Sequence, residues 1–267
     1  MPYDQAAIAI CHQFAAKAPP EAVLKEPYLP HIPARWNGIL ILGCAENLGG
    51  DKVACAWRDR LQRMAPESRY TRLEIPDGPE GRPWDNIRVR LALASIWPPI
   101  DMHEIAYSNA VPWSTNTAGK NGGFKDCPPT SNCAATLLAI DFWLRLFAEL
   151  TQLSELRLIV TLHDVAKRVA GEFIRRGAIS VPILSLYFPG PKADNIFVPK
   201  KLKRMDAVEL ERARAYVRPI ASGLKASHEM RAIDYACYAL SEARQQIGPE
   251  FHDVLQRTEM RRTHENH

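Results

Sequence analysis

Short apolar runs alternate along the chain with longer segments in which apolar residues recur every three or four positions. The apolar runs are typical of strands buried on both faces, and they cover 38–43 (GILILG), 104–111 (EIAYSNAV), 156–162 (LRLIVTL) and 181–188 (VPILSLYF). The amphipathic segments predict helices over 51–64, 85–96, 131–150 and 164–176. This alternation predicts an α/β fold, a three-layer α/β/α sandwich with a central, mostly parallel sheet of four strands.

Three regions fall outside the alternation and are expected to be additions to it. Residues 1–35 predict a helix followed by a proline-rich connector, and an insertion covers about 52–80, with a polar Pro/Gly-rich loop over 65–83. From residue 205 to the end the pattern is helical. We therefore expect an α/β domain over 1–204, with a helical appendage over 205–267 packed on it.

Composition narrows the class of protein. The 267 residues are 46% hydrophobic and 24% charged, which excludes collagen-like, coiled-coil and disordered chains. No window approaches 18 consecutive apolar residues, and no basic stretch precedes the first apolar segment, so we expect neither a membrane span nor a signal peptide. The six cysteines form no Cys-x-x-Cys pair, which predicts reduced thiols and no metal site. We expect a cytoplasmic monomer without a cofactor, and the net charge of +4 is compatible with a nucleic-acid partner.

The candidate site lies after the strands, because ligands of parallel sheets bind beyond the carboxyl ends of the strands. The first strand is followed by three polar residues, Glu46, Asn47 and Asp51, and each of them could instead cap a turn or a helix. The glycines around them fit neither the dinucleotide-binding nor the P-loop spacing. Asn109, at the second strand end, carries a donor and an acceptor that suit the edge of a pyrimidine.

The fourth strand is followed by a loop that two prolines make rigid, and then by a basic run. The loop reads FPGPKADN over 188–195. The basic run has four positive charges in five residues: Lys200, Lys201, Lys203 and Arg204. Such a run indicates either contacts with phosphates or a solvated helix start.

Taken in order, these motifs resemble those of the uracil-DNA glycosylase superfamily, nearest to its thermophile-type and related bacterial branches. The family's first strand ends in a G-E-A-P-G-like turn, a G-x-P-F segment stacks on the base, and an H-P-S-P loop grips the base and the DNA. The matching segments here, within about 36–200, are ILILGCAEN (39–47), GRPW (81–84), SNAVPW (108–113), DCPPTSNC (126–133), LIVTLHDVAKRVAG (158–171) and FPGPKADN (188–195).

The resemblance implies a role for each candidate residue in excision of a base that is flipped out of single- or double-stranded DNA. Three residues are expected to be catalytic. Glu46 stabilises the sugar cation, Asn47 positions water or the sugar, and Asp51 could take either role. The base-binding group is Cys44, Ala45, Trp84 as the stacking ring, Asn109 and Phe188. The DNA-binding group is Pro189, Gly190, Lys192, Lys200, Lys201, Lys203 and Arg204.

Two departures from the family pattern bear on the substrate. Glu46 occupies the place of the motif proline, and Phe188 that of the histidine which stabilises the departing uracil. The cysteines of the iron–sulfur branch are missing as a set, so that cluster is not expected. We therefore expect excision of uracil or of a bulkier modified cytosine, as in defence against phage DNA. The alternatives are a catalytically inactive DNA-binding protein of the same fold and an α/β enzyme acting on a small nucleoside.

Overall fold

The structure, a computed structural model, describes residues 5–47, 52–71, 86–115, 134–222, 224 and 226–254. The chain forms two compact units, the first from residues 1–81 and 104–183 and the second from residues 82–103 and 184–267. The boundary expected at residue 204 lies inside the second unit, and the assignment of domains stays a prediction. Within the described residues, no helix has the length and apolar character needed to cross a membrane.

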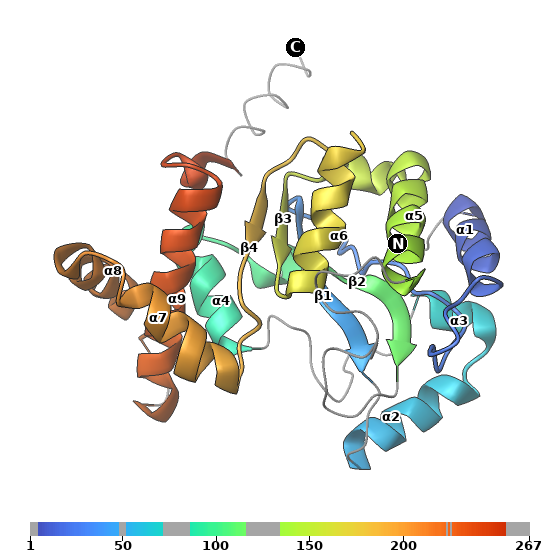
Figure 1. Ribbon diagram of the computed structural model, residues 1–267, viewed down its shortest axis with the longest axis horizontal. Coiled ribbons are helices and arrows are strands. Elements are labelled where there is room, and N and C mark those ends of the chain that lie inside the picture. The colour runs from blue at the N-terminus through green and yellow to red at the C-terminus, as the bar shows by residue number, and fades with distance from the viewer. Residues whose placement is uncertain are drawn as a thin grey trace. The chain divides into compact units, whose positions relative to one another are not determined.

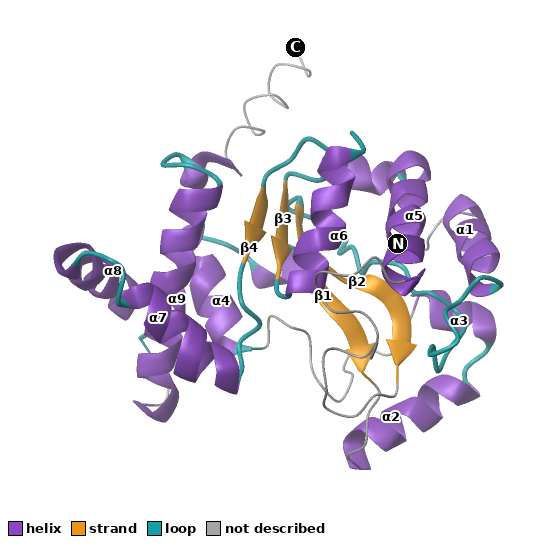
Figure 2. Cartoon of the chain, in the orientation of Figure 1, coloured by secondary structure: helices purple, strands orange, loops and turns teal. Residues whose placement is uncertain are grey.

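The centre of the fold is a four-stranded parallel sheet in the order β2-β1-β3-β4 (Figures 1 and 2). Its strands are β1 (Ile39–Asn47), β2 (Ala106–Thr115), β3 (Leu158–Thr161) and β4 (Ile183–Ser185). In register, Leu40 lies between Ala106 of β2 and Ile159 of β3. Helices flank the sheet, so the predicted α/β class is confirmed.

Two helices cover one face of this sheet, α5 (Ala134–Glu149) and α6 (Asp164–Arg175). Their aromatic side chains form the centre of the first unit's core, where the Trp143 ring lies 5.8 Å from that of Phe173. The indole N–H of Trp143 also donates to the carbonyl of Ala110 in β2 at 3.1 Å. Helix α1 (Gln5–Ala15) packs on α5 through an edge-to-face contact between Phe14 and Phe142.

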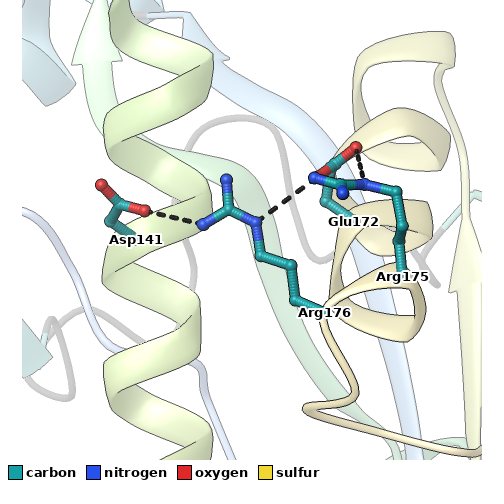
Figure 3. A network of polar contacts seen from close by, with 4 residues as sticks. All are labelled: Asp141, Glu172, Arg175 and Arg176. Carbon is teal, nitrogen blue, oxygen red and sulfur yellow. Dashed lines mark hydrogen bonds and ion pairs between the residues drawn. The ribbon is translucent and has the colours of Figure 1, made fainter.

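A network of charged side chains joins α5 to α6 on the outside of the unit (Figure 3). Arg176 lies 3.2 Å from Asp141 of α5 and 3.5 Å from Glu172 of α6, which also binds Arg175. The hydrogen bond from Arg175 lowers the pKa of the Glu172 carboxyl. Because these groups lie at the surface, the network contributes little to stability and mainly fixes how the two helix surfaces meet.

The N-terminal segment, expected as an addition, completes the sheet. Residues 22–31 run along the outer edge of β2: Val23 donates to the carbonyl of Ser114 at 2.9 Å, and His31 exchanges two backbone hydrogen bonds with Tyr107. Leu29 also donates to the carbonyl of Tyr70 at 2.7 Å. The edge of β2 is therefore covered, which protects backbone groups that would otherwise stand open.

The inserted region contains helices α2 (Lys52–Arg63) and α3 (Pro66–Thr71). The prediction of a loop from residue 65 was therefore wrong for 66–71. Pro66 starts α3, where the missing N–H costs nothing, and Tyr70 anchors the helix in the core. Residues 72–85, with Trp84, lie outside the described residues.

The second unit is built around α9 (Ala226–Gln246). Helices α4 (Ile87–Ile96), α7 (Val198–Leu202) and α8 (Ala207–Ile220) pack on it. Small buried residues along α9 permit this close approach: Ala232, Ala236, Ala239 and Ala243. A π-helical turn, Ala193–Phe197, leads into α7, and short 3-10 turns occur at Met102–Glu104, Thr151–Glu155 and Phe251–Val254.

The strands differ from their predicted limits for identifiable reasons. β1 continues beyond Gly43 because it stays paired with β2, Ala45 with Val111 and Asn47 with Thr115. The stretch 44–47, expected as a turn, is therefore strand. β4 ends before Tyr187, whose backbone N–H and C=O are bound by tyrosine hydroxyls and are not available to a strand ladder.

Candidate functional site

The strand order points to one end of the sheet. From β1 the chain passes to β2 on one side, and from β3 it passes to β4 on the other. In open parallel sheets, ligands bind outside the carboxyl ends of two such neighbouring strands. The residues at this position are those at the end of β1, from Cys44 onward, and His163, directly after β3 and Leu162.

Glu46 is the carboxylate of this strand end, and it is oriented by a partner. Its Oε2 accepts a hydrogen bond from the hydroxyl of Ser114 in β2. An irregularity brings the two side chains together, since the register passes from Ala45–Val111 to Asn47–Thr115 and leaves extra residues on β2. Glu46 is half-buried and Ser114 is fully buried, so the carboxylate is held at the border between core and surface.

The other residues predicted around Glu46 have different outcomes. Cys44 and Ala45 are half-buried and pack on the core of the first unit. Burial raises the pKa of the Cys44 thiol to about 12, so the thiol is not a nucleophile at neutral pH. The backbone of Asn47 belongs to β1, but its side chain and all of Asp51 lie outside the described residues.

His163 begins α6 at the same end of the sheet. Its Nδ1 accepts a hydrogen bond from the backbone N–H of Val165 at 3.2 Å, so it is the N-cap of the helix. Burial lowers the pKa of this imidazole, against an opposing effect of Asp164, and favours the neutral ring that the cap requires. The position of His163 could be predicted from its place after a strand, whereas its role as a cap could not.

Asn109 lies inside β2, opposite Gly43, rather than at the strand end. It is 6% exposed, its Oδ1 accepts from the hydroxyl of Tyr107 at 3.0 Å, and its Nδ2 donates to the hydroxyl of Tyr28. A Cβ at Gly43 would stand 2.1 Å from that Oδ1, so the glycine makes room for the amide. Recognition of a base by Asn109 stays a prediction, and it would use the hydrogen-bonding capacity that the tyrosines leave.

Sheet geometry gives the separation between Asn109 and Glu46. Three residues at about 3.3 Å each and one strand spacing of about 4.8 Å place their Cα atoms about 11 Å apart. Side chains alternate between the faces of a strand, so positions 43 and 46 point to opposite faces of the sheet and the spacing alone assigns the two groups no common ligand. Tyr28 and Ser114 were missed as site residues because they are far from their partners in sequence and no local pattern marks them.

In the second unit, the loop that begins at Phe188 is held firmly at its start. The N–H of Tyr187 donates to the hydroxyl of Tyr238 at 3.1 Å, and its C=O accepts from the hydroxyl of Tyr235 at 2.5 Å. The Tyr187 ring stacks on that of Phe197, with 4.4 Å between centroids. Pro189 is buried, whereas the ring of Phe188 is 58% exposed.

The same loop is also fixed at its end. Asp194, whose side chain is 5% exposed, forms an ion pair with Arg88 of α4 at 2.7 Å. Its backbone N–H donates to the carbonyl of Gly190 at 3.0 Å. The loop 188–194 is therefore attached to the helices of its own unit at both ends, which agrees with the rigidity predicted from its prolines.

The basic run divides into two parts. Lys201 points toward α9, where its ammonium lies 2.7 Å from Oε1 of the buried Glu242. Lys200, Lys203 and Arg204 are exposed, as is Lys192 in the loop, and none of these four forms an ion pair within the described part of the chain. Lys201 thus has a structural partner, while the other cations are available to phosphates.

The comparisons with known proteins add no relative. No family model, no curated protein and no solved structure matches the chain. Within the described residues, no three His, Cys, Asp or Glu side chains gather in a way that could hold a metal ion. The functional assignment therefore depends on the residues described above.

Replacing Gly43 with Ala should lower the free energy of unfolding by about 1–3 kcal/mol, the usual cost of overpacking a core. The new methyl group would displace the Asn109 amide from its tyrosine partners. Urea denaturation measures the effect. Gly171→Ala is the control, because nothing lies within 4 Å of a Cβ there and the helix should gain about 0.5–1 kcal/mol. Equal stability of Gly43→Ala and wild type would show that the amide is loosely held.

Lys201→Met should lower the free energy of unfolding by about 1–3 kcal/mol, because the buried Glu242 would lose its cation. Lys200→Met, its exposed neighbour, should change stability by less than about 0.5 kcal/mol. Both are measured by chemical denaturation. Adding Glu242→Gln to Lys201→Met should restore part of the stability. If Lys200→Met and Lys201→Met lower the stability equally, Lys201 does not have the structural role assigned to it here.

Proposed function

We propose that the protein is a DNA glycosylase that hydrolyses the N-glycosidic bond of a noncanonical or modified pyrimidine and leaves an abasic site. The substrate base is uracil or a bulkier modified cytosine. The observation that carries the proposal is the Glu46 carboxylate, which Ser114 orients beside the switch in strand order. The resemblance of the sequence motifs to glycosylases supports the same assignment.

The chemistry requires a group that stabilises positive charge on the sugar. When the bond from C1′ to the base nitrogen breaks, its electron pair leaves with the base and the sugar becomes an oxocarbenium-like cation. A fixed carboxylate near C1′ stabilises that cation without having to reorganise. Water then adds its oxygen to C1′, and its proton passes to the departing base or to solvent.

The hydrogen bond from Ser114 suits Glu46 to this role. A hydroxyl that donates to one carboxylate oxygen fixes the direction of the carboxylate. In this proposal the carboxylate so oriented faces the sugar. In this assignment Ser114 is a positioning residue and Glu46 the catalytic residue.

The exposed cations of the second unit support a polyanionic substrate. Lys192, Lys200, Lys203 and Arg204 lie within thirteen residues, and contacts from such side chains to phosphates are independent of sequence. We assign these four residues to phosphate binding and leave Lys201 out because of its bond to Glu242.

One observation favours the alternative of a DNA-binding protein without catalysis. Phe188 occupies the place of the motif histidine, and its ring cannot donate a hydrogen bond to a leaving base. Formation of abasic sites on a panel of substrates separates the two functions. The panel contains uracil, hypoxanthine, hydroxymethylcytosine and glucosylated hydroxymethylcytosine in single- and double-stranded DNA.

Glu46→Gln should lower the rate of single-turnover excision by about 10²-fold or more, because it removes the charge but keeps the size of the side chain. Affinity for DNA should change little. Glu149→Gln, a surface change on α5, is the matched control and should excise at the wild-type rate. A wild-type rate for Glu46→Gln would remove Glu46 from the mechanism, and an inactive wild type on the whole panel would refute the glycosylase.

Replacing Lys192, Lys200 and Lys203 with Gln together should weaken binding to all DNA sequences alike. A plot of the logarithm of the binding constant against the logarithm of the salt concentration has a negative slope. For single strands this slope should become shallower by about 2, at about 0.7 for each phosphate that the variant no longer neutralises. Titrations by fluorescence anisotropy at several salt concentrations measure it. The control replaces three exposed cations of the first unit, Arg145, Lys167 and Arg175, and an equal change in both triple variants would contradict the assignment.

A further inference from the structure

We infer that Phe188 is a stacking platform for an unpaired base, and that the strand bound at this loop is single-stranded DNA. The inference names the form of the substrate and rests on the proposed function only for the identity of the polymer as DNA. Three features of the second unit carry it: an exposed aromatic ring, a rigid backbone beneath the ring, and one row of cations beside it.

Phe188 exposes most of its ring although the side chain is apolar. Among the described Phe, Tyr and Trp side chains, only Phe188 and Tyr216 are exposed, at 58% and 43%. The hydroxyl of Tyr216 donates to the carbonyl of Ser95 at 3.1 Å, so that residue has a partner. Phe188 has no polar atom that could find one, and its ring offers an apolar face to solvent.

The backbone under the ring is fixed before any ligand arrives. Tyr235 and Tyr238 bind both backbone groups of Tyr187, and burial raises the pKa of Tyr235, which keeps its hydroxyl a donor. At the other end of the loop, Asp194 forms an ion pair with Arg88. A platform that is already ordered loses little conformational entropy when a base stacks on it.

The cations form one row. Lys192, Ile196 and Lys200 follow at intervals of four along the helical segment from Lys192 to Lys203, and all three are exposed. Steps of three or four stay on one side of an α-helix, so Lys200 and Lys203 share a side. In the π-helical turn a step of four falls short of a full turn, so Lys192 and Ile196 lie within part of a turn of that side. At about 1.5 Å per residue the row is about 16 Å long, enough for two or three successive phosphates of one strand.

Acidic groups near this row are already engaged. Asp194 is paired with Arg88, and Arg231 lies 3.9 Å from it. Asp206 accepts hydrogen bonds from Val208 and Glu209 as the N-cap of α8. The surface from 188 to 204 therefore presents net positive charge beside an aromatic face, the combination by which proteins bind single strands without sequence preference.

A single strand fits these features better than a duplex. The faces of bases inside a duplex are covered by their stacked neighbours, whereas an unpaired base can lay its face on an exposed ring. A duplex also presents two phosphate backbones, but the cations here follow one line. A wedge that enters a duplex needs apolar bulk alone, which leucine supplies as well as phenylalanine.

This difference defines the experiment, which uses the full chain and measures binding by fluorescence anisotropy at constant ionic strength. The probes are a labelled oligothymidylate and a blunt duplex of the same length. Phe188→Leu and Phe188→Ala should weaken binding to the single strand by about 5- to 160-fold, as expected when one stacked base contributes about 1–3 kcal/mol. Phe188→Trp should retain or raise the affinity, and duplex binding should change by less than about twofold.

Met230→Ala is the matched control, because Met230 is an equally exposed apolar residue of the same unit, and it should bind as wild type does. Two results together would overturn the inference: Phe188→Leu binds the single strand as wild type does, and Phe188→Ala loses binding to the duplex. Phe188 would then be a wedge that enters duplex DNA. Equal affinity of all variants, or no binding of the single strand by wild type, would also overturn it. Strand binding that depends on Phe188 without excision of any base would leave the inference standing and remove the glycosylase instead.

Discussion

The burial of β1 on both faces and along both edges is the constraint on which the first unit depends. Residues Ile39 to Leu42 have no exposed surface, so their backbone groups must pair with β2 on one side and β3 on the other. Neither neighbour can be removed without leaving buried polar groups open. The same pairing carries β1 past Gly43 and sets Glu46 at its end, half-buried and within reach of Ser114. The position of the candidate catalytic group is thus set by the most rigid element of the sheet.

The second unit applies a similar principle to a loop. A segment without regular structure is fixed because side chains of helices bind its backbone, Tyr235 and Tyr238 at Tyr187 and Gln246 at Ser185. The buried charge of Asp194 is neutralised by Arg88, which ties the loop's far end to α4. Rigid presentation of an exposed ring and of cations is useful for binding an extended polymer, since binding then orders little of the protein.

Identical residue types have separate roles where the surroundings differ. Lys200 and Lys201 are neighbours in sequence, but one is exposed and the other is bonded to a buried carboxylate. Tyr107 and Tyr28 likewise use their hydroxyls to hold one amide, whereas Tyr187 contributes its ring to a stack. The charge or polarity of a side chain therefore assigns it to a function only after its contacts are known.

The sequence by itself determined the elements and the class of the fold. Continuous apolar runs predict strands buried on both faces, amphipathic periods predict the helices between them, and alternation of the two predicts a parallel sheet, because these are local consequences of burial. It also directed attention to Glu46 through its place after the first predicted strand. Only the tertiary structure decided that Glu46 lies within a strand and is bound by Ser114, that Asn109 is held by Tyr28 and Tyr107, and that Lys201 faces Glu242. The physical reason is that each of these contacts joins residues that the fold, rather than the local pattern, brings together, and sequence periodicity reports the side of an element that is buried but not the partner that buries it.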